Sequence, residues 1–139
     1  MPISMSALLK PTTPPVDLSS TKSAAAALRT FFRIADAWGL SIAEQTTLLG
    51  VARTTLYQWK QGKVGPLDRH LLERLSHLFG IYSSLQILFP IAARADEWLR
   101  KPNSAPLGAE SALARMLGGQ VADLYVVRQY LDAQRGGKA

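Results

Sequence analysis

The chain has 139 residues, no cysteine and a formal net charge of +6. This length suits one compact helical domain or two small ones that share an interface, and the lack of cysteine excludes disulfides and thiolate metal sites and fits a reducing cytoplasm. The N-terminal residues contain several prolines and no long apolar stretch, so we expect a cytoplasmic protein with no signal peptide or membrane span.

Positive charge is concentrated in the first half of the chain. Six basic and two acidic residues lie between Lys22 and Pro66, and no acidic residue occurs between Glu44 and Asp68. Such a stretch produces a local positive field that suits a phosphate backbone. Charge alone is also compatible with a merely solvated basic face.

The first segments in chain order are an arm and a helix. Residues 1–20 mix proline, serine and threonine without apolar periodicity, which predicts a disordered or loosely docked arm. Apolar residues then recur at three- and four-residue steps from Lys22 to Trp38, which predicts a helix that ends at Gly39.

Residues 41–61 have the pattern of a helix-turn-helix. Ser41 followed by Glu44 is a capping box that opens a short helix, and Gly50 supplies the left-handed conformation of the turn. A second helix begins near Arg53 and places Leu56 and Trp59 inward against the first. Ala52, which precedes it, has no side-chain oxygen and forgoes up to about 1 kcal/mol of capping.

Polar and cationic side chains lie on the outward side of this second helix. Its first turn is the end that enters the major groove, where arginine and glutamine can bind guanine and adenine with two hydrogen bonds, whereas lysines farther along suit phosphates. A glycine-linked helical pair could also be only a packing hairpin, but its coincidence with the basic stretch favours DNA binding. The expected DNA-binding residues are Arg53, Thr54, Thr55, Tyr57, Gln58, Lys60 and Lys63.

Further helices are expected at 67–79, 82–89, 92–99, 109–117 and 121–134. Gly80 should end the first of these and Pro90 the second. No segment alternates apolar and polar residues as a strand does, so the sequence predicts an all-α fold.

The histidines are too far apart to hold one metal ion. His70 and His77 are seven residues apart, which is about 10 Å along a helix. The sequence also lacks a paired nucleophile and base and any phosphate-binding loop. We therefore expect no metal, no cofactor and no enzymatic activity.

The last predicted helix has two apolar faces. One face can pack on the domain, whereas the other needs a partner or another helix of the same chain. The first stripe is Val121, Leu124, Val127 and Leu131, and the second is Ala122, Val126, Tyr130 and Ala133.

Three segments of the second half resemble the Xre/MbcA/ParS-type antitoxins. They are Asp-Glu-Trp-Leu-Arg-Lys-Pro-Asn at 96–103, Met-Leu-Gly-Gly at 116–119 and Ala-Asp-Leu-Tyr-Val-Val-Arg-Gln-Tyr-Leu-Asp at 122–132. The resemblance extends over about residues 28–137 and joins an Xre-like helix-turn-helix to a C-terminal toxin-binding module. The chain departs from the family at 107–109, where Leu-Gly-Ala replaces an aromatic residue or leucine followed by two glycines.

The resemblance implies a partner and a mode of action. The partner would be a RES-type toxin that degrades NAD, whose active site the C-terminal region occludes, and the antitoxin would repress its own operon as a homodimer or a larger complex with the toxin. The basic tail would reach into the toxin pocket. The implied toxin-binding residues are Tyr125, Arg128, Gln129, Tyr130, Asp132, Arg135, Gly136, Gly137 and Lys138.

The expected organisation is an arm at 1–20, a helix-turn-helix DNA-binding bundle at 21–80, and a small helical toxin-binding and oligomerisation region at 81–139. The alternative is a stand-alone helix-turn-helix transcriptional regulator whose C-terminal helices only dimerise. That alternative shares every feature of the first half and predicts no neighbouring toxin gene.

Overall fold

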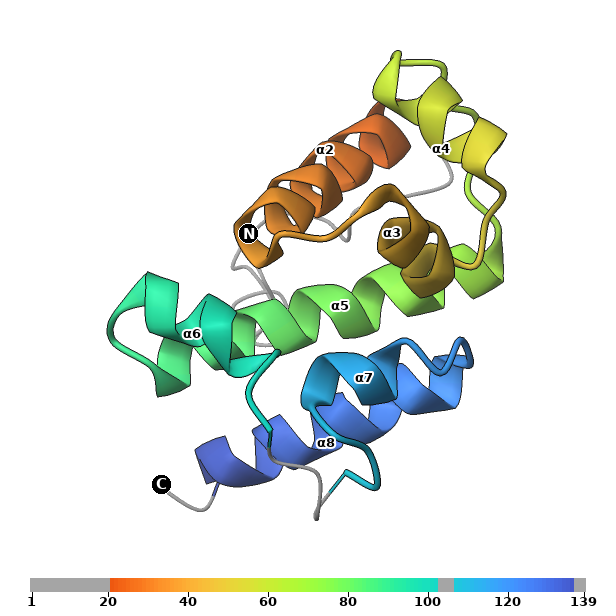
Figure 1. Cartoon of the computed structure of the whole chain (residues 1–139). Coiled ribbons are helices and arrows are strands. Elements are labelled where there is room, and N and C mark those ends of the chain that lie inside the picture. The colour runs from red at the N-terminus through yellow and green to blue at the C-terminus, as the bar shows by residue number, and fades with distance from the viewer. Residues whose placement is uncertain (1–20, 103–106, 137–139) are drawn as a thin grey trace, which may run out of the picture.

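The computed structural model describes residues 21–102 and 107–136, and this part of the chain contains seven α-helices and no strand (Figure 1). The predicted all-α fold is therefore confirmed. The arm expected at 1–20 lies outside the described residues, as do Gly137 and Lys138. The helices are α2 (Thr21–Trp38), α3 (Ile42–Leu49), α4 (Arg53–Lys60), α5 (Arg69–Leu88), α6 (Ala92–Trp98), α7 (Ala112–Met116) and α8 (Val121–Gly136).

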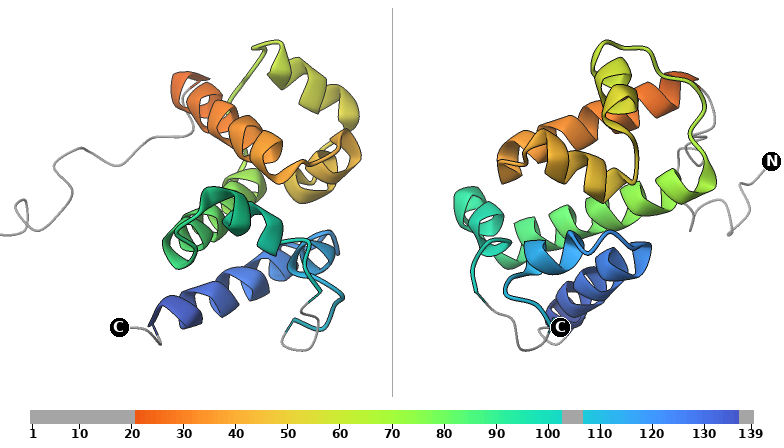
Figure 2. Two further views of the ribbon diagram at one scale, coloured as in Figure 1. Left: turned by 60° about the vertical axis from the view of Figure 1, so that its left-hand side comes forward. Right: turned by 45° about the vertical axis from the view of Figure 1, so that its right-hand side comes forward.

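Helix α5 forms the middle layer of the molecule. Figures 1 and 2 show α2, α3 and α4 on one side of α5, and α7 and α8 on the other. Buried apolar residues of α5 recur along its whole length at helical spacing and reach both neighbouring layers. These residues are Leu71, Leu75, Leu78, Ile81 and Leu85.

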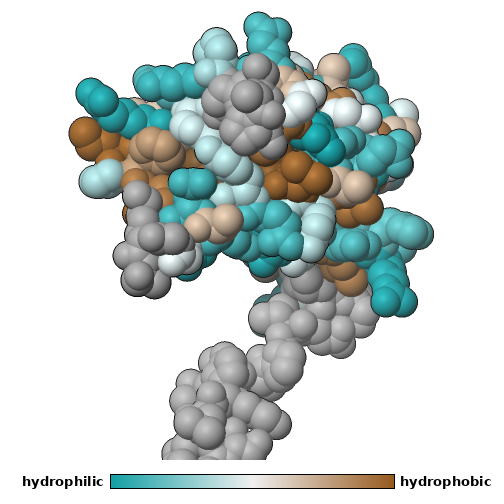
Figure 3. Space-filling model, turned by 90° about the horizontal axis from the view of Figure 1, so that it is seen from below, coloured by the Kyte–Doolittle hydropathy of each residue, from teal (hydrophilic) through white to brown (hydrophobic). Residues whose placement is uncertain are grey.

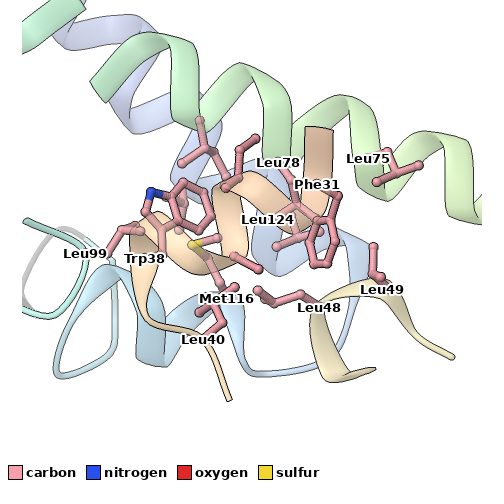
Figure 4. Packing of buried hydrophobic residues seen from close by; sticks show 14 of the residues in the cluster. Phe31, Trp38, Leu40, Leu48, Leu49, Leu75, Leu78, Leu99, Met116 and Leu124 are labelled. Atoms are coloured by element: carbon pink, nitrogen blue, oxygen red, sulfur yellow. The ribbon is translucent and has the colours of Figure 1, made fainter. Parts of the chain in front are cut away.

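One hydrophobic core joins the two halves of the chain. Figure 4 shows Phe31 and Leu48, from the first half, in the same cluster as Leu78, Met116 and Leu124. Of the aromatic residues with inward helical positions in the sequence, Phe31 and Trp38 are buried. The others are half-buried at the margin of this core, namely Phe32, Trp59, Phe79, Phe89 and Trp98.

The expected helix end at Gly80 is wrong, because α5 continues without interruption to Leu88. Gly80 instead faces α8, and a Cβ atom at this position would lie 2.5 Å from Nε and 2.7 Å from Cζ of Arg128. The glycine therefore makes room for a neighbouring side chain. The helix does end before Pro90, as predicted, since Phe89 is extended with φ −119° and ψ 115°.

The last two helices differ slightly from their predicted bounds. Helix α7 begins at Ala112, later than expected, because the Ser111 hydroxyl caps it by accepting a hydrogen bond from the Ala114 amide at 3.1 Å. Helix α8 begins at Val121 as predicted and extends to Gly136.

Polar side chains fix α8 against α5. Arg128 donates to the backbone oxygen of Ser76 at 3.2 Å, and its Nε lies 3.8 Å from the Asp132 carboxylate. The buried hydroxyl of Ser84 donates to Asp132 at 3.1 Å and accepts a hydrogen bond from Arg135 at 3.2 Å. Four polar side chains, those of Ser84, Arg128, Asp132 and Arg135, thus stabilise the pairing of the two helices.

The imidazole of His77 lies in the same contact. Its ring centroid is 5.8 Å from that of Tyr125, and its Nδ1 is 3.4 Å from a guanidinium nitrogen of Arg128. Burial and the positive charge of Arg128 lower the pKa of His77, and the carboxylate of Glu73 opposes this shift. The folded protein therefore favours the neutral imidazole.

Truncation of a buried side chain in α5 should destabilise the whole molecule. We expect Leu78→Ala, at a fully buried position, to lower the free energy of unfolding by about 2–5 kcal/mol in urea denaturation. Ile87→Ala is the matched control on the same helix, since that side chain is 61% exposed, and should change stability by no more than about 0.5 kcal/mol. Equal losses at the two positions would contradict the burial of Leu78 in the core.

The lowered pKa of His77 predicts a pH dependence of stability. The unfolded chain takes up the proton more readily than the folded one, so the contribution of His77 is present above about pH 6.5 and is lost as the pH falls toward the lowered pKa. We expect the free energy of unfolding to decrease between about pH 7 and pH 5.5, and to decrease less in His77→Gln. Parallel pH profiles of the two proteins, measured by urea denaturation, would refute this assignment.

Candidate functional sites

Helices α3 and α4 form the predicted helix-turn-helix. The Ser41 hydroxyl accepts a hydrogen bond from the Glu44 amide at 3.0 Å, and the Glu44 carboxylate accepts one from the Ser41 amide at 2.9 Å. Gly50 has φ 67°, the left-handed conformation that the turn requires. Ala52 makes no side-chain capping bond at the start of α4. The capping box, the turn glycine and the uncapped second helix are all confirmed.

Most of the predicted DNA-binding side chains share the outward face of α4 and the loop after it. Leu56 is fully buried and holds the opposite face of α4 to the core. Thr55 is half-buried and lines, together with Trp59, an open groove of about 590 Å³ between α4 and the start of α5. The exposed members of the set are Arg53, Thr54, Tyr57, Gln58, Lys60 and Lys63.

The cations of this face carry no acidic partner in the described part of the chain. Asp68, which lines the same groove as Thr55, accepts a hydrogen bond from the Leu71 amide at 2.9 Å and forms no ion pair within the described residues. Glu44 accepts a hydrogen bond from Ser41 and forms an ion pair with Arg100 at 3.4 Å. The ammonium of Lys60 lies 5.2 Å from the ring centroid of Phe32 and remains exposed. The face therefore presents uncompensated positive charge together with hydrogen-bonding side chains, which is the chemistry that a DNA groove and its phosphates require.

The segment 96–102 forms the joint between the two halves. Leu99 is buried in the core, and the Asp96 carboxylate accepts a hydrogen bond from Gln86 at 3.4 Å. Burial raises the pKa of Asp96, and the hydrogen bond from Gln86 opposes the shift. Arg100 donates to the carbonyl oxygens of Trp38 at 3.2 Å and Gly39 at 3.0 Å, at the end of α2. Much of this segment, which resembles the antitoxin family in sequence, thus holds the two halves of the chain together.

A second arginine also links the halves. Arg74 of α5 donates to the carbonyl oxygens of Thr47 at 3.4 Å and Leu48 at 3.2 Å, near the end of α3. Its other terminal nitrogen donates to the carbonyl oxygen of Gly119 at 2.8 Å, in the turn before α8. Because the carbonyls at a helix C-terminus lack partners within the helix, a guanidinium group is well suited to satisfy them.

An apolar surface, which we call the corner face, lies where α5 meets α6. Ile87 and Ile91 are 61% and 57% exposed. A hollow of about 200 Å³ is lined by their sequence neighbours Leu88 and Phe89 and by Trp98 and Tyr130. Figure 3 shows apolar side chains at the edge of the molecule on the side where α6 lies in Figure 1. Large apolar side chains exposed in this way are typical of interaction sites. The corner face consists of Ile87, Leu88, Phe89, Ile91, Trp98 and Tyr130.

Aromatic rings hold the corner face in shape. Trp98 stacks on Tyr130 with ring centroids 6.2 Å apart and an interplanar angle of 11°. Phe89 lies against the other side of the same cluster, with its ring centroid 6.5 Å from that of Trp98. A preorganised apolar surface loses little conformational freedom when a partner covers it.

The predicted toxin-binding residues of α8 do not share one environment. Arg128, Asp132 and Arg135 are hydrogen-bonded to α5, whereas Tyr125 and Gln129 are exposed and hydrogen-bonded to each other. Tyr130 lines the hollow of the corner face, and Gly136 is the last residue of α8. The structure therefore brings Tyr130 together with residues that the sequence did not predict as toxin-binding, notably Leu88 and Phe89.

The two apolar stripes of α8 have different environments. Leu124, Val127 and Leu131 of the first stripe are buried. In the second stripe Val126 and Tyr130 are half-buried, and the two alanines, Ala122 and Ala133, are exposed. The second stripe is therefore only partly covered by the described part of the chain. No described helix is long and apolar enough to cross a membrane.

Both halves of the chain match models of known protein families. Residues 17–80 match the family model described as the antitoxin Xre-like helix-turn-helix domain, and residues 84–137 match that of the antitoxin Xre/MbcA/ParS C-terminal toxin-binding domain. The chain is also similar to the uncharacterized protein y4oB of Sinorhizobium fredii, at 54% identity over 113 residues, which are 81% of this chain and 86% of that protein. The α3–α4 unit lies in the first matched range and the corner face in the second. The chain therefore belongs to the Xre/MbcA/ParS-type antitoxins, with an Xre-like helix-turn-helix and a C-terminal toxin-binding domain.

Proposed function

We propose that this antitoxin neutralises a RES-type, NAD-degrading toxin by covering its active site, and that it represses its own operon by binding operator DNA as a homodimer or a larger complex with the toxin, in the cytoplasm. The observation that carries the proposal is the presence of two chemically different exposed faces on one core. One is the cationic outward face of α4, and the other is the apolar corner face of the toxin-binding domain.

The α4 face supports operator recognition. Arg53 and Gln58 are exposed and free to form two-pronged hydrogen bonds with guanine and adenine, and Thr54 can contact a phosphate or a thymine methyl group. Lys60 and Lys63 are placed to contact phosphates, which adds affinity without sequence preference. Repression of the chain's own operon requires such a combination of base and phosphate contacts at its promoter.

The C-terminal half supports toxin binding through two kinds of residues. Tyr125, Gln129 and Tyr130 would touch the toxin, together with the corner face and the tail residues Gly136, Gly137 and Lys138. Arg128, Asp132 and Arg135 would act by holding α8 on α5, since their hydrogen bonds are already made within the chain. An apolar centre with a polar rim is the usual composition of a stable protein interface.

Replacement of the base-facing side chains should separate the two activities. We expect Arg53→Ala with Gln58→Ala to weaken binding to the DNA upstream of the gene by about 1–3 kcal/mol per side chain, because each loses a base contact. Fluorescence anisotropy with a labelled duplex measures the loss. The same variant should still protect cells from the toxin, and failure to protect by a folded variant would refute the division of labour between the faces.

Charge placed on the corner face should have the opposite effect. We expect Ile87→Asp with Ile91→Asp to remain folded, since both side chains are exposed, to bind DNA as the unmodified chain does, and to lose toxin binding because an apolar contact would have to bury carboxylates. The test is co-expression with the adjacent open reading frame, followed by growth, cellular NAD and co-purification. Protection by this variant would exclude the corner face. No toxicity and no complex with the unmodified chain would favour a stand-alone regulator.

A further inference from the structure

Helix α2 carries a line of cations on its solvent face, which we call the α2 stripe. It consists of Lys22, Arg29 and Arg33, whose spacings of seven and four residues place them on one side of the helix. All three are exposed. The one hydrogen bond that their side chains make within the described residues joins Arg33 to the Thr30 hydroxyl at 3.4 Å.

Five arginines elsewhere in the chain are used differently. Their guanidinium groups are bonded to backbone oxygens or side chains of other segments, as the Arg115 side chain is to Asp123 at 2.9 Å and to the Leu107 carbonyl oxygen at 2.6 Å. The set that is tied into the fold in this way comprises Arg74, Arg100, Arg115, Arg128 and Arg135. By contrast, the side chains of the α2 stripe make no hydrogen bond or ion pair to another helix within the described part of the chain.

The like charges of the stripe oppose formation of the helix that carries them. Arg29 and Arg33 are four residues apart, a spacing at which two cations repel each other across one helical turn. Asp36 is the acidic residue nearest to them along this face, and it forms no ion pair within the described part of the chain. A polyanion bound along the stripe would remove this repulsion.

Lys60 of the α4 face approaches helix α2 next to the stripe. Phe32 lies beside the stripe in α2, and the ammonium of Lys60 from α4 sits 5.2 Å from its ring centroid. Figures 1 and 2 show α2 and α4 together on the side of α5 away from α8. Phe32 is three residues after Arg29 in α2, so Lys60 approaches the side of the helix that carries Arg29.

We propose that the α2 stripe is a second DNA contact, which binds phosphates of the backbone flanking the groove that α4 enters. The inference rests on the proposed DNA binding and adds residues to it. Guanidinium and ammonium groups form charge-assisted hydrogen bonds with phosphate oxygens and release condensed counterions, so they increase affinity equally for all sequences. The stripe would therefore fix the orientation of the protein on the duplex without reading bases.

The test is the salt dependence of DNA binding by the full chain carrying Arg29→Gln with Arg33→Gln. Two duplexes of about 30 base pairs are used, one from the region upstream of the gene and one of scrambled sequence. The logarithm of the association constant falls linearly with the logarithm of the salt concentration, by about 0.9 per phosphate contact. Loss of two contacts should therefore make this slope about 1.8 less steep. The preference for the upstream duplex should stay unchanged, and thermal unfolding should show that the variant is folded.

Arg94→Gln with Lys101→Gln is the matched control, because it removes the same charge from exposed positions in or after α6, away from α4. It should leave the slope within about 0.5 of that of the unmodified chain. An unchanged slope in the α2 variant, an equal decrease in the control, or an altered sequence preference would each overturn the proposal. If the unmodified chain binds neither duplex, the proposed DNA-binding function itself fails, which is a separate result.

Discussion

Burial of α5 on two opposite sides is the constraint on which the rest of the structure depends. Its apolar residues contact α2 and α3 on one side and α8 on the other, so the helix has to pass through the molecule unbroken. The two matched family ranges, 17–80 and 84–137, therefore share one core, and residue 80 lies inside a helix. The predicted boundary after residue 80, between a DNA-binding and a toxin-binding region, remains a prediction about function, because α5 crosses it without a break.

The first half of the fold could be predicted because its signals are local. The capping box of Ser41 and Glu44 and the left-handed Gly50 are decided by residues within one or two turns of each other. Gly80 was misread because its role depends on Arg128, which is distant in the chain and comes close only after folding. Glycine ends many helices, but it is equally the residue that permits close approach of a neighbour.

In the candidate sites, too, the residues that depend on local signals could be predicted and those that depend on distant partners could not. The outward face of α4 follows from helical periodicity and a core position at Leu56, so its exposed residues could be named from the sequence. The partners of Arg128 and Asp132 are serines of α5, and a serine on a helix gives no local sign that it will meet a charged group. The corner face was missed because an expected break at Gly80 hides the fact that Ile87 continues α5 on its uncovered side.

The arginine bonds across α5 have a consequence for how partners are accommodated. Arg74 and Arg100 hold the helix-turn-helix to the C-terminal half, so the molecule presents its faces at fixed positions. The α4 face and the α8 side are separated by the full layer of α5 (Figure 1). Under the proposed function, a duplex and a toxin would not compete for the same atoms, and one antitoxin could hold both simultaneously. Antitoxin bound at the promoter would then also retain neutralised toxin there, beside the gene that encodes more antitoxin.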